Sequence, residues 1–230
     1  MYQLTNFTSR DELDNSFAEQ VAQLLTLAIA QKGSASIAVS GGSTPKGFFH
    51  ALSQKKLAWD KVTVTLADER WVDENNDASN THLVKENLLQ NNASSATFFN
   101  LKIADELNQI TLEQLNKSVA PILPLDVLIL GMGEDGHTAS LFPCSEQINE
   151  ALSLDNAVSL ISVQPKTAPH LRISFTLAAL LKSHTVFLHL CGENKQQVLQ
   201  QALADENAVV MPIRAFLHNN KVTTEIMYAN

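Results

Sequence analysis

The chain has 230 residues, 45% of them hydrophobic, and carries 16 Lys and Arg against 24 Asp and Glu, a formal net charge of −8. This length and apolar content are enough for one large α/β domain with a full core and no disulfide or metal staples. The negative charge argues against nucleic acid or an anionic membrane as the main partner. An anionic small molecule is still compatible with it, held by a few local cations and backbone N–H groups.

The cysteine content and the N-terminal segment indicate where the protein works. Cys144 and Cys191 are too few for a disulfide framework and lack metal-ligand spacing, so we expect reduced thiols and a cytoplasmic location. The N-terminus has no basic region followed by an apolar one, and no apolar run is long enough for a bilayer. We therefore expect neither secretion nor membrane insertion. The oligomeric state stays open between a monomer and a small homo-oligomer.

The first half of the chain alternates helix and strand patterns. Ser9 and Glu12 have capping-box spacing, and apolar residues at helical intervals predict a long helix that opens the chain and ends at Gly33. The patterns further predict strands over 36–40, 62–66, 96–101 and 127–130, and helices over 45–53, 80–89 (capped by Ser79 or Asn80) and 105–118. Such alternation is typical of a parallel sheet.

The pattern loosens after Pro143. It predicts strands over 157–163, 171–175 and 185–191, helices over 176–181 and 193–204, and closing or edge strands over 212–217 and 223–227. No internal repeat or clear linker divides the chain. We predict one Rossmann-like, doubly wound, mostly parallel α/β domain over residues 1–230, with a small subdomain possible in the second half.

A glycine-rich turn follows the apolar run Val127–Leu130. Gly131, Gly133 and Gly136 match a G-x-G-x-x-G spacing, but the third glycine is followed by His137 and an early proline instead of a helix. We therefore reject a dinucleotide site and expect no cofactor. Open α/β sheets bind ligands at the carboxyl ends of their strands, so His137 is a candidate catalytic residue.

A second glycine loop, Ser40–Pro45, follows the predicted strand 36–40. Its glycines allow backbone N–H groups to face a ligand, and its hydroxyls add donors at the start of a helix, which suits a phosphate or other oxyanion. A strand-to-helix turn capped by Ser43 or Thr44 explains the same residues without a ligand. Both interpretations stay open from this segment alone.

Charged residues also stand at other predicted strand ends. Asp68, Glu69 and Arg70 follow the strand 62–66, and parallel strands would place them at the same sheet edge as both glycine loops. Arg172 and Lys195 lie where each could reach a phosphate. A surface ion-pair cluster is the alternative for residues 68–70, although a position directly after an apolar strand favours a site. For Arg172 or Lys195 taken alone, a solvated surface charge is the more common explanation. The remaining histidines show no metal-ligand spacing, so we expect no metal.

Taken together, these segments resemble the 6-phosphogluconolactonase family. The resemblance rests on Ser40–Pro45, 68–72 with Ser79 and Asn80, Gly131–Pro143, 172–176 and 192–195, in matching order. The block G-x-G-x-D-G-H-T-A-S-L-F-P is its most specific part. Cys144 departs from the glycine that commonly follows F-P, and residues 211–214 match less well.

The resemblance implies a fold shared with glucosamine-6-phosphate deaminases and ribose-5-phosphate isomerases, and hydrolysis of 6-phosphoglucono-δ-lactone in the oxidative pentose phosphate pathway. It places the phosphate on Gly42, Ser43 and Thr44, near Arg172 and Lys195. It implies that His137 is the general base and that Asp68 and Arg70 line the lactone end of the pocket. It also implies that Asn80 either touches the sugar or holds the loop.

Two alternative functions, one enzymatic and one non-catalytic, fit part of the same sequence pattern. A glucosamine-6-phosphate deaminase or isomerase shares the phosphate loop and D-G-H, but the segment 138–143 lacks the carboxylate that follows D-G-H in that family. A non-catalytic sugar-phosphate sensor would normally carry a DNA-binding helix-turn-helix, and no basic recognition helix is evident here. No G-x-S-x-G motif points to a serine nucleophile.

Overall fold

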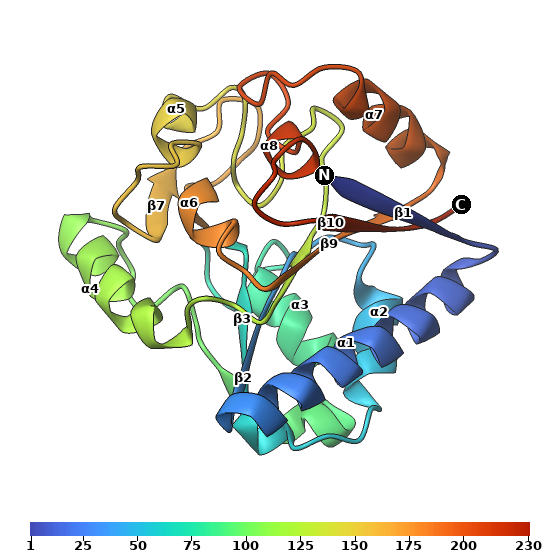
Figure 1. Cartoon of the computed structure of the whole chain (residues 1–230). Coiled ribbons are helices and arrows are strands. Elements are labelled where there is room, and N and C mark those ends of the chain that lie inside the picture. Colours follow the sequence, from blue (N-terminus) through green and yellow to red (C-terminus); the bar gives the residue numbers. More distant parts are fainter.

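The computed structural model describes residues 1–230 and is built around one seven-stranded sheet (Figure 1). Its strands lie in the order β1-β10-β9-β6-β2-β3-β5, and every neighbouring pair is parallel. The bounds are β1 Tyr2–Phe7, β2 Ala35–Val39, β3 Val62–Leu66, β5 Thr97–Phe98, β6 Val127–Leu130, β9 Thr185–Cys191 and β10 Thr224–Ala229. The predicted mostly parallel α/β class is confirmed.

Helices cover both faces of this sheet. They are α1 Arg10–Lys32, α2 Lys46–Ser53, α3 Asn80–Asn87, α4 Gln109–Val119, α5 Ile148–Ala151, α6 Leu177–Leu180, α7 Glu193–Leu203 and α8 Arg214–Leu217, with 3-10 turns at Trp59–Lys61, Asn91–Ser95 and Ala120–Ile122. Figure 1 shows α1, α2 and α3 to the right of β2 and β3 and below β9 and β10, and α7 and α8 above β9 and β10. None of the helices is long and apolar enough to cross a membrane.

The local signals at the ends of α1 act as predicted. The Ser9 hydroxyl accepts the Glu12 N–H at 3.2 Å, and Gly33 ends the helix with φ 85°, a left-handed conformation that glycine adopts without steric cost. Between these caps α1 buries a stripe of apolar side chains, including Phe17, against the sheet and α2. Strands β2 and β6 are buried at every residue, as expected of central parallel strands.

The strand order reverses between β2 and β6. From β2 the chain moves through β3 to β5 on one side, and then returns to β6, on the other side of β2, before continuing to β9 and β10. The loops that leave adjacent strands β2 and β6 therefore diverge at their carboxyl ends. Such a reversal opens a crevice in doubly wound folds, and both glycine loops of the sequence border it.

A second, three-stranded antiparallel sheet stands next to this crevice. It consists of β4 Asp68–Arg70, β8 Arg172–Phe175 and β7 Leu160–Val163, in that order. Asp68 pairs with Ser174, and Arg70 pairs with Arg172. The segment 68–70 is thus a strand in its own right, and its pairing with β8 brings two arginines from distant parts of the chain side by side.

Several predicted elements differ from those observed. The long helix does not open the chain, because β1 precedes it as an edge strand exposed along almost its whole length. Residues 212–217 form no strand: their buried residues Ile213, Phe216 and Leu217 have the i, i+3, i+4 spacing of the short helix α8. The predicted strand at 223–227 is β10, which lies between β1 and β9 rather than at an edge.

Candidate active site

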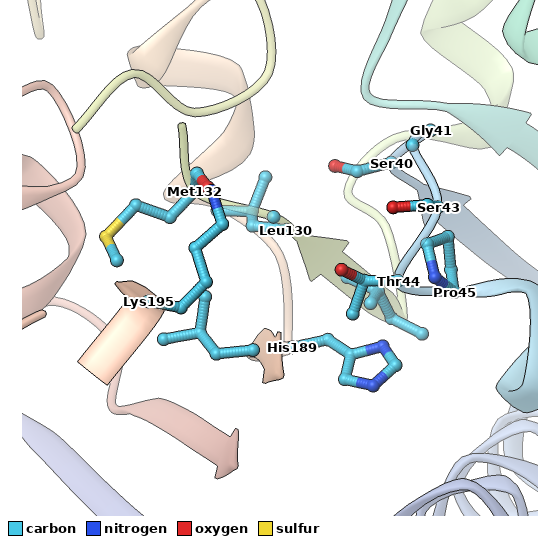
Figure 2. A pocket seen from close by; sticks show the side chains of 13 residues that line it. Ser40, Gly41, Ser43, Thr44, Pro45, Leu130, Met132, His189 and Lys195 are labelled. Atoms are coloured by element: carbon cyan, nitrogen blue, oxygen red, sulfur yellow. The ribbon is translucent and has the colours of Figure 1, made fainter. Parts of the chain in front are cut away.

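A cavity of about 200 Å³ opens at the carboxyl ends of β2, β6 and β9. The loop Ser40–Pro45 forms one wall, and residues 129–132 with Lys195 form the other. Figure 2 shows the hydroxyls of Ser40, Ser43 and Thr44 pointing from their wall toward Lys195. The structure therefore brings together the predicted phosphate-binding residues Gly42, Ser43, Thr44 and Lys195 around one space.

The hydroxyls of Ser43 and Thr44 do not cap α2. The N-cap position is Pro45, which makes no side-chain capping bond. Gly42 has φ 104°, in the region that strongly favours glycine. The capped-turn interpretation of this loop is therefore not what the chain adopts, and its hydroxyls are left to serve the cavity.

Lys195 is fixed from the opposite wall. It lies in the first turn of α7, and its Nζ donates to the Met132 carbonyl at 2.7 Å. An ammonium group has three N–H donors, so this single bond leaves donors available to a ligand in the cavity. The contact also ties α7 to the loop that follows β6.

A second cavity, of about 170 Å³, continues the first. Both are lined by Ser40, Gly41, Gly42, Gly131 and Met132. The second adds all five remaining predicted site residues, namely Asp68, Arg70, Asn80, His137 and Arg172. The two spaces form one elongated crevice, with hydroxyls and a lysine at one end and a histidine with two arginines at the other.

His137 is paired with a carboxylate from its own loop. Its Nδ1 lies 2.5 Å from Asp135 Oδ1, and its ring stacks on Phe142 with centroids 4.1 Å apart. Burial by itself raises the pKa of Asp135, but the hydrogen bond and charge of His137, with nearby backbone N–H groups, lower it below the ordinary value. Asp135 is therefore an ionised acceptor that orients the His137 ring.

Gly133 and Gly136 of this loop must be glycines for different steric reasons. A Cβ on Gly133 would lie 2.1 Å from His137 Nδ1 and 2.7 Å from Asp135 Oδ1, so this position must lack a side chain. Gly136 has φ 74°, and a Cβ there would meet Met211 at 2.7 Å. The glycine spacing that looks like a nucleotide motif thus makes room for the histidine and its carboxylate.

Asp68 does not contact His137. Its carboxylate accepts the Ser140 hydroxyl and lies 3.8 Å from Arg172 Nη1. Arg172 is only 6% exposed, and its guanidinium lies over the Phe142 ring at 4.9 Å. Burial lowers the pKa of Arg172, while the negative charge of Asp68 opposes that shift. Asp68 therefore holds an arginine and a serine in place at the His137 end of the crevice.

Asn80 holds two segments of the crevice wall together. Its Nδ2 donates to the Asp68 carbonyl at 2.9 Å, and its Oδ1 would lie 1.8 Å from a Cβ on Gly41, so Gly41 must be a glycine. The buried Glu69 carboxylate accepts the N–H groups of Asn80 and Thr81 at 2.8 and 2.7 Å. These bonds anchor the start of α3 to β4 and fix Asn80 against the phosphate loop.

Four buried polar atoms of residues that line the crevice have no hydrogen-bond partner in the chain: Ser40 Oγ, Arg70 Nε, Arg172 Nε and His189 Nδ1. Buried polar groups are usually satisfied, so this concentration at one site indicates a polar ligand. Arg70 Nη1 donates to the Ala78 carbonyl at 2.7 Å, which holds its guanidinium in place. Two of the four are arginine N–H donors and one is a hydroxyl, and these three suit ligand oxygens.

Sequence reasoning missed part of this site. Asp135 was within the glycine block, two residues before His137, and that short spacing was the available signal for a carboxylate–imidazole pair. Ser140 and the Met132 carbonyl carry no comparable signal, because their partners Asp68 and Lys195 are more than 60 positions away in sequence.

The comparisons with known proteins agree with this geometry. Residues 8–225 match the family model described as glucosamine-6-phosphate isomerases/6-phosphogluconolactonase. The chain belongs to this family. A 6-phosphogluconolactonase of Rhizobium meliloti is 42% identical over 224 residues, covering 97% of each chain. One of Neisseria meningitidis is 40% identical over the full length of both.

Solved structures of the glucosamine-6-phosphate isomerase/6-phosphogluconolactonase family show the same arrangement. The crystal structure of a 6-phosphogluconolactonase from Shewanella baltica matches with a TM-score of 0.96 and 40% identity. The match covers 100% of this chain and 98% of that one. The family resemblance inferred from the motif blocks is thereby confirmed.

Proposed function

We propose that this chain is a 6-phosphogluconolactonase, which hydrolyses 6-phospho-D-glucono-1,5-lactone to 6-phospho-D-gluconate in the oxidative pentose phosphate pathway. The observation that carries the proposal is the crevice itself. One end presents the Ser40–Pro45 loop and Lys195, and the other presents His137 paired with Asp135. The full-length identity of about 40% to proteins named 6-phosphogluconolactonase supports it.

The phosphate binds at the Lys195 end. Backbone N–H groups around Gly42 and the hydroxyls of Ser43 and Thr44 donate to phosphate oxygens from one wall, at the start of α2, where the helix dipole favours an anion. Lys195 adds a positive charge from the other wall. This arrangement offsets the overall charge of −8 locally.

His137 acts as the general base at the lactone end. Its Nδ1 proton is held by the Asp135 carboxylate, so Nε2 carries the lone pair that takes a proton from the attacking water. The carboxylate also stabilises the imidazolium that forms as the water adds to C1. The imidazolium then returns this proton to the ring oxygen O5 as the C1–O5 bond breaks, which opens the lactone to the acid. A positioned base of this kind contributes about 10²–10⁴ in rate.

The arginines stabilise the negative charge that develops on the lactone carbonyl oxygen. Arg70 and Arg172 are neighbours across β4 and β8, and each has an unpartnered buried Nε on the crevice. Asp68 and the Ala78 carbonyl hold them in position. Removing one such donor typically costs about 3 kcal/mol of transition-state stabilisation. In this account Asp68 positions Arg172 and does not orient His137.

The partner of the protein is then a small phosphorylated sugar lactone, handled in the cytoplasm without a cofactor. The purified protein, assayed with fresh 6-phosphogluconolactone beside glucosamine 6-phosphate, tests the proposal. We expect acid release well above spontaneous hydrolysis from the lactone and no ammonia from the amino sugar. Ammonia release would establish a deaminase, and binding of both compounds without turnover of either would establish a non-catalytic sensor.

A further inference from the structure

A buried acid–base pair lies directly behind the phosphate-binding wall of the crevice. His189 of β9 lines the cavity, is 4% exposed, and has no partner for its Nδ1. Figure 2 shows its ring beneath Thr44 and Pro45. Its Nε2 lies 3.9 Å from Asp14 Oδ1, too far for a hydrogen bond, so the carboxylate has a neighbouring ring but no hydrogen bond from it.

Asp14 reaches this position from α1 and lies against the start of α2. Its Oδ2 would lie 2.0 Å from a Cβ on Gly47, and the Phe48 N–H points toward the carboxylate. The N-terminus of α2 therefore has Asp14 on one side and the phosphate loop on the other. Two anions that share one helix N-terminus repel each other and compete for the same favourable dipole.

We propose that Asp14 and His189 form a titratable pair whose negative charge weakens phosphate binding, and which takes up a proton when phosphate binds. The inference rests on the proposed phosphate site at Ser40–Pro45. It makes Asp14 an affinity-setting residue that touches neither the substrate nor the reacting atoms. Substrate and product carry the same phosphate, so their binding is affected alike and release of 6-phosphogluconate is eased.

The groups that face the pair allow this titration near neutral pH. Burial, followed by the charge of Asp11, raises the pKa of Asp14 to about 6, against the opposing effects of Arg10 and the Phe48 N–H. Burial lowers the pKa of His189 to about 4, so the ring is neutral. The other charged or titratable groups around the pair are Cys191, whose Sγ lies 3.9 Å from His189 Nε2, and Lys195 across the cavity.

The size of the coupling follows from simple electrostatics. Two negative charges placed within about a Debye length of a partly buried carboxyl raise its pKa by about one unit. Starting from a pKa of about 6, the protonated fraction of Asp14 at pH 7 rises from about a tenth to about a half. Binding therefore takes up about 0.4 proton at pH 7.

Titration calorimetry with 6-phosphogluconate tests the proposal. Wild-type protein, measured at pH 7 in two buffers of different ionisation enthalpy, is expected to take up about 0.4 proton per ligand bound. Asp14→Asn is expected to abolish the uptake and to bind about five- to tenfold more tightly at pH 7.5, with equal affinities near pH 5. Glu19→Gln is the matched control, because it removes one carboxylate charge from an exposed position of the same helix whose charge is not among those that shift the pKa of Asp14.

The outcomes separate this inference from the function on which it rests. If wild-type protein binds 6-phosphogluconate with no more proton uptake than Asp14→Asn, or if Asp14→Asn binds more weakly, the inference is overturned and the phosphate site stands. If wild-type protein does not bind 6-phosphogluconate, the proposed function fails as well. The absence of uptake by wild-type protein alone would also overturn the inference, even if the variant did not fold.

Discussion

Replacing Asp135 by asparagine tests the pair that we place at the centre of the chemistry. The 2.5 Å contact between Asp135 Oδ1 and His137 Nδ1 becomes a neutral hydrogen bond in Asp135→Asn, or is lost if the amide presents its N–H₂ group. A hydrogen bond to a charged group contributes about 1.5–3 kcal/mol. Because the Asp135 side chain is 40% exposed, solvent screening favours the lower part of that range.

The expected result is therefore a fall in kcat/KM of about 10- to 30-fold, mostly in kcat, because the missing charge stabilises the transition state. Hydrolysis of freshly made 6-phosphogluconolactone, corrected for the spontaneous reaction, measures it. Glu134→Gln is the control, since this exposed neighbour makes no side-chain hydrogen bond. In a His137→Ala background the Asp135 substitution should cost nothing further. Equal activities of the Asp135 and Glu134 variants would refute the reasoning.

The remaining predictions concern three other parts of the structure. Thr44→Ala should raise KM about tenfold or more at nearly unchanged kcat, because it removes one hydrogen bond to the charged phosphate. Steady-state kinetics measures both constants. Gly133→Ala should lower kcat at least about tenfold, because its Cβ would lie 2.1 Å from His137 Nδ1 and displace the ring. Asp14→Asn should stabilise the fold above pH 6, as urea unfolding at several pH values would show. The pKa of Asp14 rises on folding from 3.8 to about 6. As the pH rises through this range, the wild-type free energy of unfolding therefore falls by up to about 3 kcal/mol, because the carboxyl ionises more readily in the unfolded chain.

The parts of the site that sequence analysis located consist of residues that lie close together in the sequence. The glycine block places Gly131, Gly133, Gly136 and His137 within seven positions, directly after a strand whose continuous apolar run marks it as buried. The loop at Ser40–Pro45 likewise follows a buried strand, β2, and it leads into helix α2. Because parallel strands share one carboxyl edge, these local signals were enough to predict that the segments meet.

The parts that it missed depend on contacts between distant segments. Asp68 meets Ser140 across 72 positions, and Asp14 meets Gly47 and His189 only once α1, α2 and β9 have packed together. Neither contact leaves a periodic pattern in the sequence. Strand β1 was missed for a different reason: it is exposed along almost its whole length, so no core selects an alternating apolar pattern.

The misassigned segment 212–217 shows how short elements escape pattern analysis. Helix α8 spans only Arg214–Leu217, little more than one turn, and all of its residues except Ala215 are buried. Over four residues a buried helix and a buried strand have the same apolar composition. The Arg214 guanidinium donates to the Asp205 carboxylate and to the Gln201 carbonyl, both at 2.9 Å, near the end of α7, and no local pattern reveals these contacts.

The most direct test of the account is the activity of His137→Gln with 6-phosphogluconolactone, measured beside its affinity for 6-phosphogluconate. Glutamine retains hydrogen-bonding capacity but supplies no base near neutral pH. We predict a fall in kcat of at least about 100-fold, with a product dissociation constant within about threefold of wild type. Turnover close to that of the wild type would contradict the assignment of His137 as the base.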